Sequence, residues 1–98
     1  MEVSVRYDKH PQPFTLRLDG SVTVEELLSQ ICKQIQLETY CMEALVVKRG
    51  FPPRPVELVK EQTLSQAAFS AREKLVVSLE DEMAEKLRAE HYANMTPL

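Results

Sequence analysis

The sequence predicts an α+β fold of two layers, in which one amphipathic helix covers one face of a small mixed sheet. Three observations lead to this prediction. Apolar and polar residues alternate over residues 3–7 and again over 14–18, which is the period of a half-buried strand. Apolar residues recur at helical spacing over 24–35, and a final alternating run occupies 74–79. A chain of 98 residues is long enough to bury one such core.

The first two strands are expected to form a hairpin, because only the loop-type residues 8–13 separate them. The inward-facing side chains should be the apolar members of the two alternations, namely Val3, Val5, Tyr7, Phe14, Leu16 and Leu18. Successive side chains of a strand point to opposite faces, so Arg6 and Arg17 should lie on the outer face of the sheet.

The helix over 24–35 has a clear beginning. Thr23 can cap it, and Glu26 three residues later predicts a capping box, in which each side chain bonds the other residue's backbone N–H. The apolar stripe that should face the sheet consists of Val24, Leu27, Leu28, Ile31, Cys32 and Ile35. A short turn or helix start is expected over 38–43.

Two short strands and a helical turn are predicted in the next part of the chain. A third strand over 44–48 would leave Val46 and Lys48 on the outer face, and a fourth is expected over 56–59. A single helical turn should begin at 62–66, with apolar residues of this region dipping into the core.

This element order predicts that the first and last strands are parallel neighbours at the centre of the sheet, joined by a right-handed crossover through the helix. We therefore expect one domain over residues 1–80. Residues 81–98 should form a helical tail with a thin apolar stripe at Met83 and Leu87, either loosely docked or the start of a linker.

The tetrad Phe51-Pro52-Pro53-Arg54 predicts a stiff, extended loop, because proline fixes its own φ and restricts the residue before it. An aromatic ring and a guanidinium are favoured anchors at protein interfaces. We therefore interpret the loop as a preformed docking element. The alternative is a proline-rich turn in which Phe51 packs inward.

The outer sheet face is a second candidate for binding. Val46 and Val76 should be exposed there, close to Arg6, Arg17 and Lys48. An apolar spot with a basic rim suits a protein partner with acidic groups, and arginine can grip a carboxylate with two hydrogen bonds. The alternative is an ordinary solvated strand face with two tolerated valines.

The composition argues against several other classes of function. The net charge of −3 gives no basic excess for nucleic acid, and no apolar run is long enough to cross a membrane. No secretory leader is visible, so reduced thiols and a cytoplasmic or nuclear location are expected.

The residues that could carry chemistry are sparse and scattered. Cys32 belongs to the helix stripe, whereas Cys41 should be more accessible, and neither His10 nor His91 is placed near it by any local argument. No metal-ligand cluster and no glycine-rich phosphate loop are present in the sequence. We therefore expect a non-catalytic module without a cofactor.

The stretch Val3-Ser4-Val5-Arg6-Tyr7 resembles the first strand of UBX domains, and Phe51-Pro52-Pro53-Arg54 resembles their Phe-Pro-Arg loop. Val3 to Leu79 as a whole is similar to a ubiquitin-like β-grasp, closest to the UBX-like N-terminal domains of OTU-family deubiquitinases. The second proline shifts Arg54 by one position relative to the plain UBX loop, and the loop between the first two strands is longer.

The resemblance implies a function in the ubiquitin pathway. Such domains bind the N-terminal domain of the valosin-containing AAA ATPase. Arg6 would make a charged contact with it, Phe51 with Pro52 or Pro53 would fill an apolar cleft, and Arg54 would take a carboxylate or carbonyl beside it. The chain would then be a monomeric module embedded in a longer protein, such as a deubiquitinase.

Two other functions remain open at this level. A Ras-binding type of ubiquitin-like domain would contact a small GTPase through Arg6, Lys9 and Arg17, with no role for the proline loop. An internal regulatory domain would instead pack against a catalytic domain of its own chain. Fold alone decides between none of these.

Overall fold

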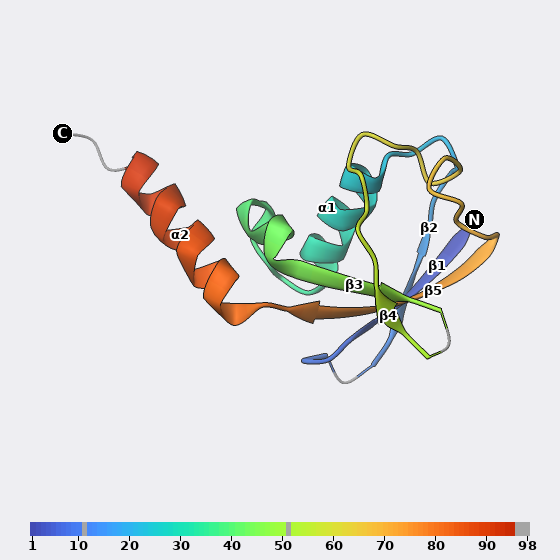
Figure 1. The fold of residues 1–98 in the computed structure, drawn as a ribbon, viewed down its shortest axis with the longest axis horizontal. Helices are drawn as coiled ribbons and strands as arrows, with labels where there is room; N and C mark the ends of the chain where they lie inside the picture. Colours follow the sequence, from blue (N-terminus) through green and yellow to red (C-terminus); the bar gives the residue numbers. More distant parts are fainter. Residues whose placement is uncertain (11, 51, 96–98) are drawn as a thin grey trace.

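The computed structural model describes residues 1–10, 12–50 and 52–95. In chain order, its elements are β1 (Glu2–Tyr7), β2 (Phe14–Arg17), α1 (Val24–Gln34), the 3₁₀ helix η1 (Thr39–Ala44), β3 (Leu45–Arg49), β4 (Arg54–Pro55), β5 (Arg72–Leu79) and α2 (Asp81–Met95). Figure 1 shows α1 against one face of the sheet and α2 projecting away from it.

The described strands form one mixed sheet of five, in the order β2-β1-β5-β3-β4. β1 is parallel to β5, and the other neighbouring pairs are antiparallel. The predicted parallel pairing of the first and last strands is therefore confirmed, as is the α+β class. This order also places β2 and β4 at the two edges of the sheet.

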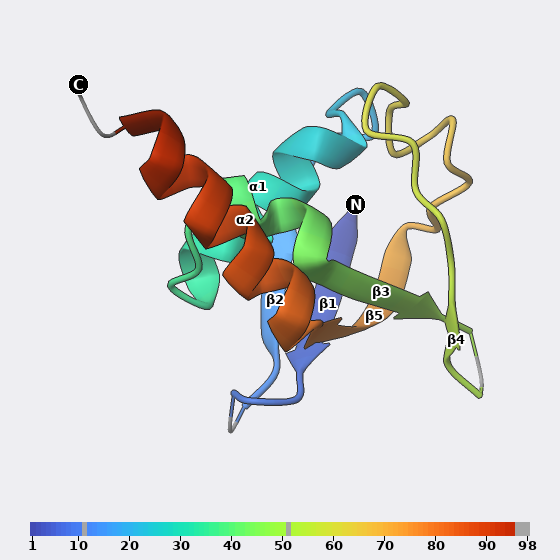
Figure 2. The same ribbon diagram turned by 60° about the vertical axis from the view of Figure 1, so that its left-hand side comes forward.

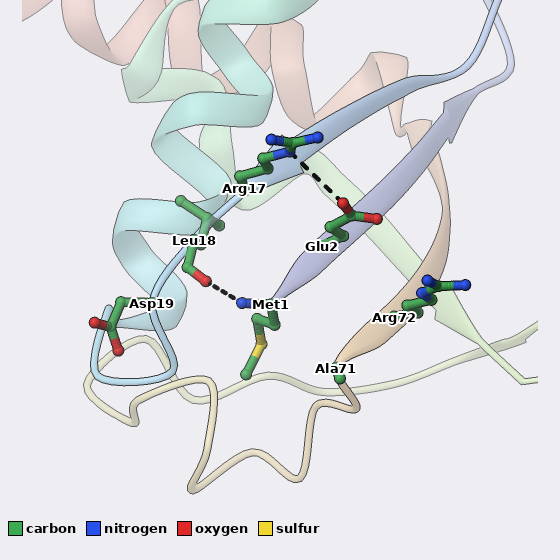
Figure 3. A pocket seen from close by; sticks show the side chains of 7 residues that line it. All are labelled: Met1, Glu2, Arg17, Leu18, Asp19, Ala71 and Arg72. Carbon is green, nitrogen blue, oxygen red and sulfur yellow. Dashed lines mark hydrogen bonds and ion pairs between the residues drawn. The ribbon is translucent and has the colours of Figure 1, made fainter.

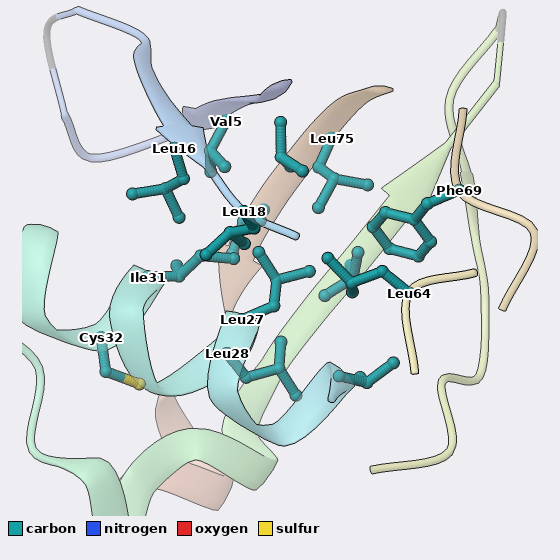
Figure 4. Packing of buried hydrophobic residues seen from close by; sticks show 14 of the residues in the cluster. Val5, Leu16, Leu18, Leu27, Leu28, Ile31, Cys32, Leu64, Phe69 and Leu75 are labelled. Carbon is teal, nitrogen blue, oxygen red and sulfur yellow. The ribbon is translucent and has the colours of Figure 1, made fainter. Parts of the chain in front are cut away.

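The core lies between α1 and the inner face of the sheet, as Figure 4 shows. Leu27 and Ile31 of α1 have no exposed surface, and neither has Val5 of β1 or Val77 of β5. Burying a side chain of this size contributes roughly 1.5–3 kcal/mol each. The helical stripe and the strand alternation predicted from the sequence thus meet in one cluster.

The start of α1 forms only half of the predicted capping box. The Thr23 hydroxyl accepts a hydrogen bond from the Glu26 N–H at 3.2 Å. The Glu26 carboxylate does not return to Thr23 but accepts from the Gln30 side chain at 3.3 Å, one turn along the helix. The side-chain part of the cap therefore depends on Thr23 alone.

The fourth strand lies earlier than predicted. β4 consists of Arg54 and Pro55, which pair with Arg49 and Lys48 at the sheet edge, whereas the segment 56–59 has no strand structure. Val56 still donates to the Val47 carbonyl at 3.0 Å, which ends the pairing. Beyond it, the chain turns toward the start of α1, where Lys60 and Gln62 accept backbone hydrogen bonds from the first residues of the helix. Because the residues that follow bond the start of α1, the segment 56–59 does not continue along β3.

The segment between β4 and β5 closes the open end of the core. Leu64 has no exposed surface and Phe69 is buried, which confirms that this turn region dips into the core. Thr63 forms an isolated bridge with Thr23, so the same segment also holds the helix cap in place.

The prediction that Cys41 is accessible is wrong. Cys41 is fully buried with Ala44 and Ala84 in a second, smaller cluster between η1 and α2. The stripe predicted for the tail is also partly wrong, because Ala84 faces inward while Met83 is 38% exposed. No pattern in the sequence indicated that η1 would be a docking surface for α2.

Three contacts between side chains accompany this docking of α2. Arg88 pairs with Glu38 at 3.4 Å, and His91 stacks on Tyr40 with ring centroids 3.8 Å apart. At the start of α2, Asp81 pairs with Lys9 of the first hairpin at 2.8 Å. Figure 2 shows α2 beside η1, with which it shares the smaller cluster. The tail is therefore docked in this structure; the boundary predicted at residue 80 stays a prediction.

Candidate protein-binding face

The outer face of the sheet, opposite α1, brings several predicted site residues into one row. The strand registers place Arg6 of β1 beside Val76 of β5, Val76 beside Lys48 of β3, and Lys48 beside Pro55 of β4. Directly opposed residues on neighbouring strands are about 5 Å apart at their Cβ atoms. An apolar side chain thus lies between two cations, and a proline extends the row to the sheet edge.

A groove of about 430 Å³ opens over this row. Its apolar lining comes from Pro13 of the first hairpin loop, Pro53 of the β3–β4 turn and Val76. Arg6 and Lys48 stand at its sides, and neither forms an ion pair with any residue that the structure describes. No carboxylate is among the described residues that line it. The groove therefore offers an apolar floor and uncompensated positive charge, which suits an acidic protein surface.

Arg17 does not reach this groove. It lies two rows away, where it pairs with Glu2 at 3.6 Å beside the hollow shown in Figure 3. Lys9 is likewise engaged, by Asp81. Two of the three cations on which the GTPase alternative depends are therefore in exposed ion pairs.

The remaining predicted site residues lie at the border of the groove or beyond it. Val46 and Val76 are half-buried rather than fully exposed, and Val46 sits in the next row, opposite Ser78. Pro52 is exposed in the turn, and Arg54 is exposed on β4, opposite Arg49. Phe51 lies outside the described residues.

Sequence reasoning missed Pro13 and Lys74, which also line the groove. Lys74 could have been found, because the alternation that turns Val76 outward turns Lys74 outward as well. No sequence signal pointed to Pro13, since its place depends on how the hairpin loop folds back over the sheet.

Neither thiol is available for nucleophilic chemistry in this fold. Burial raises the pKa of Cys32 to about 11. Burial is also the main cause of the raised pKa of Cys41. A protonated, buried thiol is inert. Within the described residues, no three His, Cys, Asp or Glu side chains come together to hold a metal, and no helix is long and apolar enough to cross a membrane.

Comparison with known proteins agrees with this description. The family model described as "OTU1, UBXL domain" matches residues 1–56. The chain belongs to the OTU1 UBXL family. The match covers more than half of the chain and includes Arg6, Lys48 and the proline turn, and it confirms the predicted resemblance. No curated protein sequence matches the chain.

Among solved structures, this UBXL domain is similar to a ubiquitin from Caldiarchaeum subterraneum. The TM-score is 0.62 at 15% sequence identity, over 81% of this chain and 91% of the archaeal one. Identity this low supports the fold alone, and the predicted ubiquitin-like β-grasp is confirmed. Family and fold together define a non-catalytic ubiquitin-like module for protein interaction.

Proposed function

We propose that this UBXL domain docks the protein that carries it onto the N-terminal domain of the valosin-containing AAA ATPase. The observation that carries the proposal is the row Arg6–Val76–Lys48, with the proline turn at its end and an apolar groove above it. The same Arg6 and proline-turn residues carry the sequence resemblance to UBX domains. Two independent lines of reasoning thus lead to one surface.

Each part of this surface has a distinct physical task. The prolines fix the backbone of the turn before binding, so little conformational entropy is lost when a partner covers it. Pro53 and Val76 supply apolar area that is removed from water. Arg6 and Lys48 pair with carboxylates of the partner and steer its approach. Arg54 is exposed on the edge strand and takes a carboxylate or carbonyl beside the cleft.

Phe51 is proposed as the apolar anchor on the strength of the sequence alone. Two residues close to it in the sequence, Gly50 and Pro53, line the groove. A single buried aromatic anchor often dominates the energy of an interface. We further propose that the module acts as a monomer in the cytoplasm or nucleus, within the ubiquitin pathway.

The test is a calorimetric titration of the chain against the isolated N-terminal domain of the AAA ATPase. Phe51→Ala and Arg6→Ala should each weaken binding by roughly thirty-fold or more, the effect of losing a hot spot. Arg17→Ala is the matched control for Arg6→Ala, because both arginines lie on the outer face but only Arg6 lines the groove. Circular dichroism confirms that each variant folds. Parent-like binding by both Phe51→Ala and Arg6→Ala would refute the proposal.

A further inference from the structure

The outer face of the sheet carries further positively charged side chains besides Arg6 and Lys48. Lys74 and Gly50 line the groove and also line a second hollow beside it, whose other lining residues are Arg72 and Glu73. The two hollows therefore adjoin each other along β5. This extension lies outside the row that supports the proposed function.

The cations along this surface recur at the period of a strand. Arg72, Lys74 and Val76 are alternate residues of β5 and share its outer face, where they stand beside Glu2, Ser4 and Arg6 of β1 in turn. Alternate residues of a strand are about 7 Å apart. Positive charge is thus present in three successive rows: at Arg6 and Lys48, at Lys74, and at Arg72.

The two nearby carboxylates, Glu2 opposite Arg72 and Glu73 in the lining of the second hollow, are each paired with another arginine. Glu2 pairs with Arg17, and Glu73 pairs with Arg49, where both side chains are largely buried. Neither Lys74 nor Arg72 forms an ion pair among the described residues. Successive rows lie within one Debye length of each other at physiological salt, so these like charges repel, and a bound anionic segment would relieve the repulsion.

We propose that Lys74 and Arg72 form a second subsite of the docking face, which takes an extended acidic segment with carboxylates at alternate positions. The segment belongs to the same partner that fills the groove, so this inference rests on the proposed function. An extended chain repeats its side chains at the same spacing as β5, which lets successive carboxylates meet successive rows. Its contacts are made by side chains, because the backbone of the central strand β5 is already paired on both sides.

An acidic protein segment fits this surface better than nucleic acid does. The positive rows border the apolar floor formed by Val76 and Pro53, which offers nothing to a sugar-phosphate backbone. The chain as a whole carries a net charge of −3, so it lacks the basic excess that is typical of nucleic-acid-binding domains.

The test compares Lys74→Glu and Arg72→Glu with Lys33→Glu and Lys86→Glu, which make the same charge reversal at exposed positions on α1 and α2. Each variant is titrated with the isolated N-terminal domain of the AAA ATPase. Lys74→Glu should weaken binding roughly ten-fold at low salt and flatten its salt dependence, and Arg72→Glu should act in the same direction. The two controls should change binding less than about two-fold. Unchanged binding by Lys74→Glu, while Phe51→Ala loses it, overturns the second subsite and leaves the proposed function standing.

A second titration uses a synthetic peptide with glutamates at alternate positions, and an isomeric peptide with its glutamates in one block. Preferential binding of the alternating peptide, lost in Lys74→Glu, supports the subsite even if the AAA ATPase domain fails to bind. Equal binding of the two peptides, or no binding of either, overturns it. Tighter binding of a single-stranded oligonucleotide than of the alternating peptide also overturns it.

Discussion

The guanidinium of Arg49 lies over the ring of Phe69, with its central carbon 4.4 Å from the ring centroid. The same group donates to the carbonyls of Ala67 and Ala68, each at 3.1 Å, and pairs with Glu73. Ala68 has a left-handed backbone with φ of 60°, which is unfavourable for alanine. Arg49 therefore ties the end of β3 to this strained segment, directly before the proline turn.

Replacing Arg49 by alanine should lower the free energy of unfolding by about 2–4 kcal/mol, since charge-assisted hydrogen bonds and a cation–π contact are lost together. Arg49→Lys should cost roughly half as much, because an ammonium keeps the charge but not the planar fork. Urea unfolding measures the loss of stability in both variants. Arg54→Ala is the control, because Arg54 lies opposite on β4 and is exposed; it should cost less than about 0.5 kcal/mol. Equal costs for Arg49→Ala and Arg54→Ala would contradict the role of Arg49.

The docking of α2 on η1 can be tested with a larger side chain at its centre. Ala84 is 1% exposed, so Ala84→Leu should overpack the cluster and cost about 1–3 kcal/mol. Hydrogen exchange at the amides of α2 should accelerate as the helix loosens. Ala89→Leu makes the same change at an exposed position of the same helix and should leave exchange unchanged. If the two variants exchange alike, α2 is not docked through Ala84.

The half-formed capping box makes a prediction about α1. Thr23→Ala should lower stability by ~1 kcal/mol, because the Glu26 N–H loses its acceptor, while Thr23→Ser should be nearly neutral. Glu26→Ala should cost about 0.5 kcal/mol or less, since only the pair with Gln30 is lost. Thermal unfolding of the three variants measures these differences in stability. A larger effect at Glu26 than at Thr23 would indicate that the reciprocal bond forms in solution.

The buried thiol of Cys32 predicts a loss of stability in alkali. Its pKa rises from 9.0 to about 11 on folding, so between these values the unfolded chain binds fewer protons than the folded one. The contribution of the Cys32 thiol to the free energy of unfolding is therefore complete below pH 9 and declines as the pH rises toward 11. Urea unfolding across this range should show the decline, and Cys32→Ala should reduce its slope. The variant also corrects for lysines and tyrosines that titrate in the same range. An identical slope in Cys32→Ala would contradict the assignment.

Arg17 distinguishes the proposed function from a GTPase-binding domain. Its side chain is 86% exposed and its pair with Glu2 is worth little, so Arg17→Glu should change stability by less than about 0.5 kcal/mol. Binding to the AAA ATPase domain should fall far less than in Arg6→Glu. Titration against a small GTPase in its GTP-bound form tests the GTPase-binding alternative directly. Binding there that depends on Arg17 and not on Phe51 would favour the alternative.

Local patterns in the sequence were enough for the fold. Strand alternation and the helical stripe specify which side chains face the core, and element order with the right-handed crossover rule leaves few topologies. The same alternation assigned Arg6, Lys48 and Val76 to one face, because side-chain direction in a strand depends only on position along it. For this reason the row at the centre of the candidate site could be predicted.

Tertiary structure decided what depends on contacts between distant segments. The fourth strand moved to Arg54 and Pro55 because the following residues bond the start of α1, and Cys41 became buried because α2 folds back on η1. Arg17 lies outside the site because the register of β1 and β2 places it opposite Glu2, two rows from Arg6, and Pro13 joins the groove through the way the hairpin loop closes over the sheet. Periodicity records only which way a residue faces within its own element. Which residues meet across elements depends on packing, which a one-dimensional pattern does not contain.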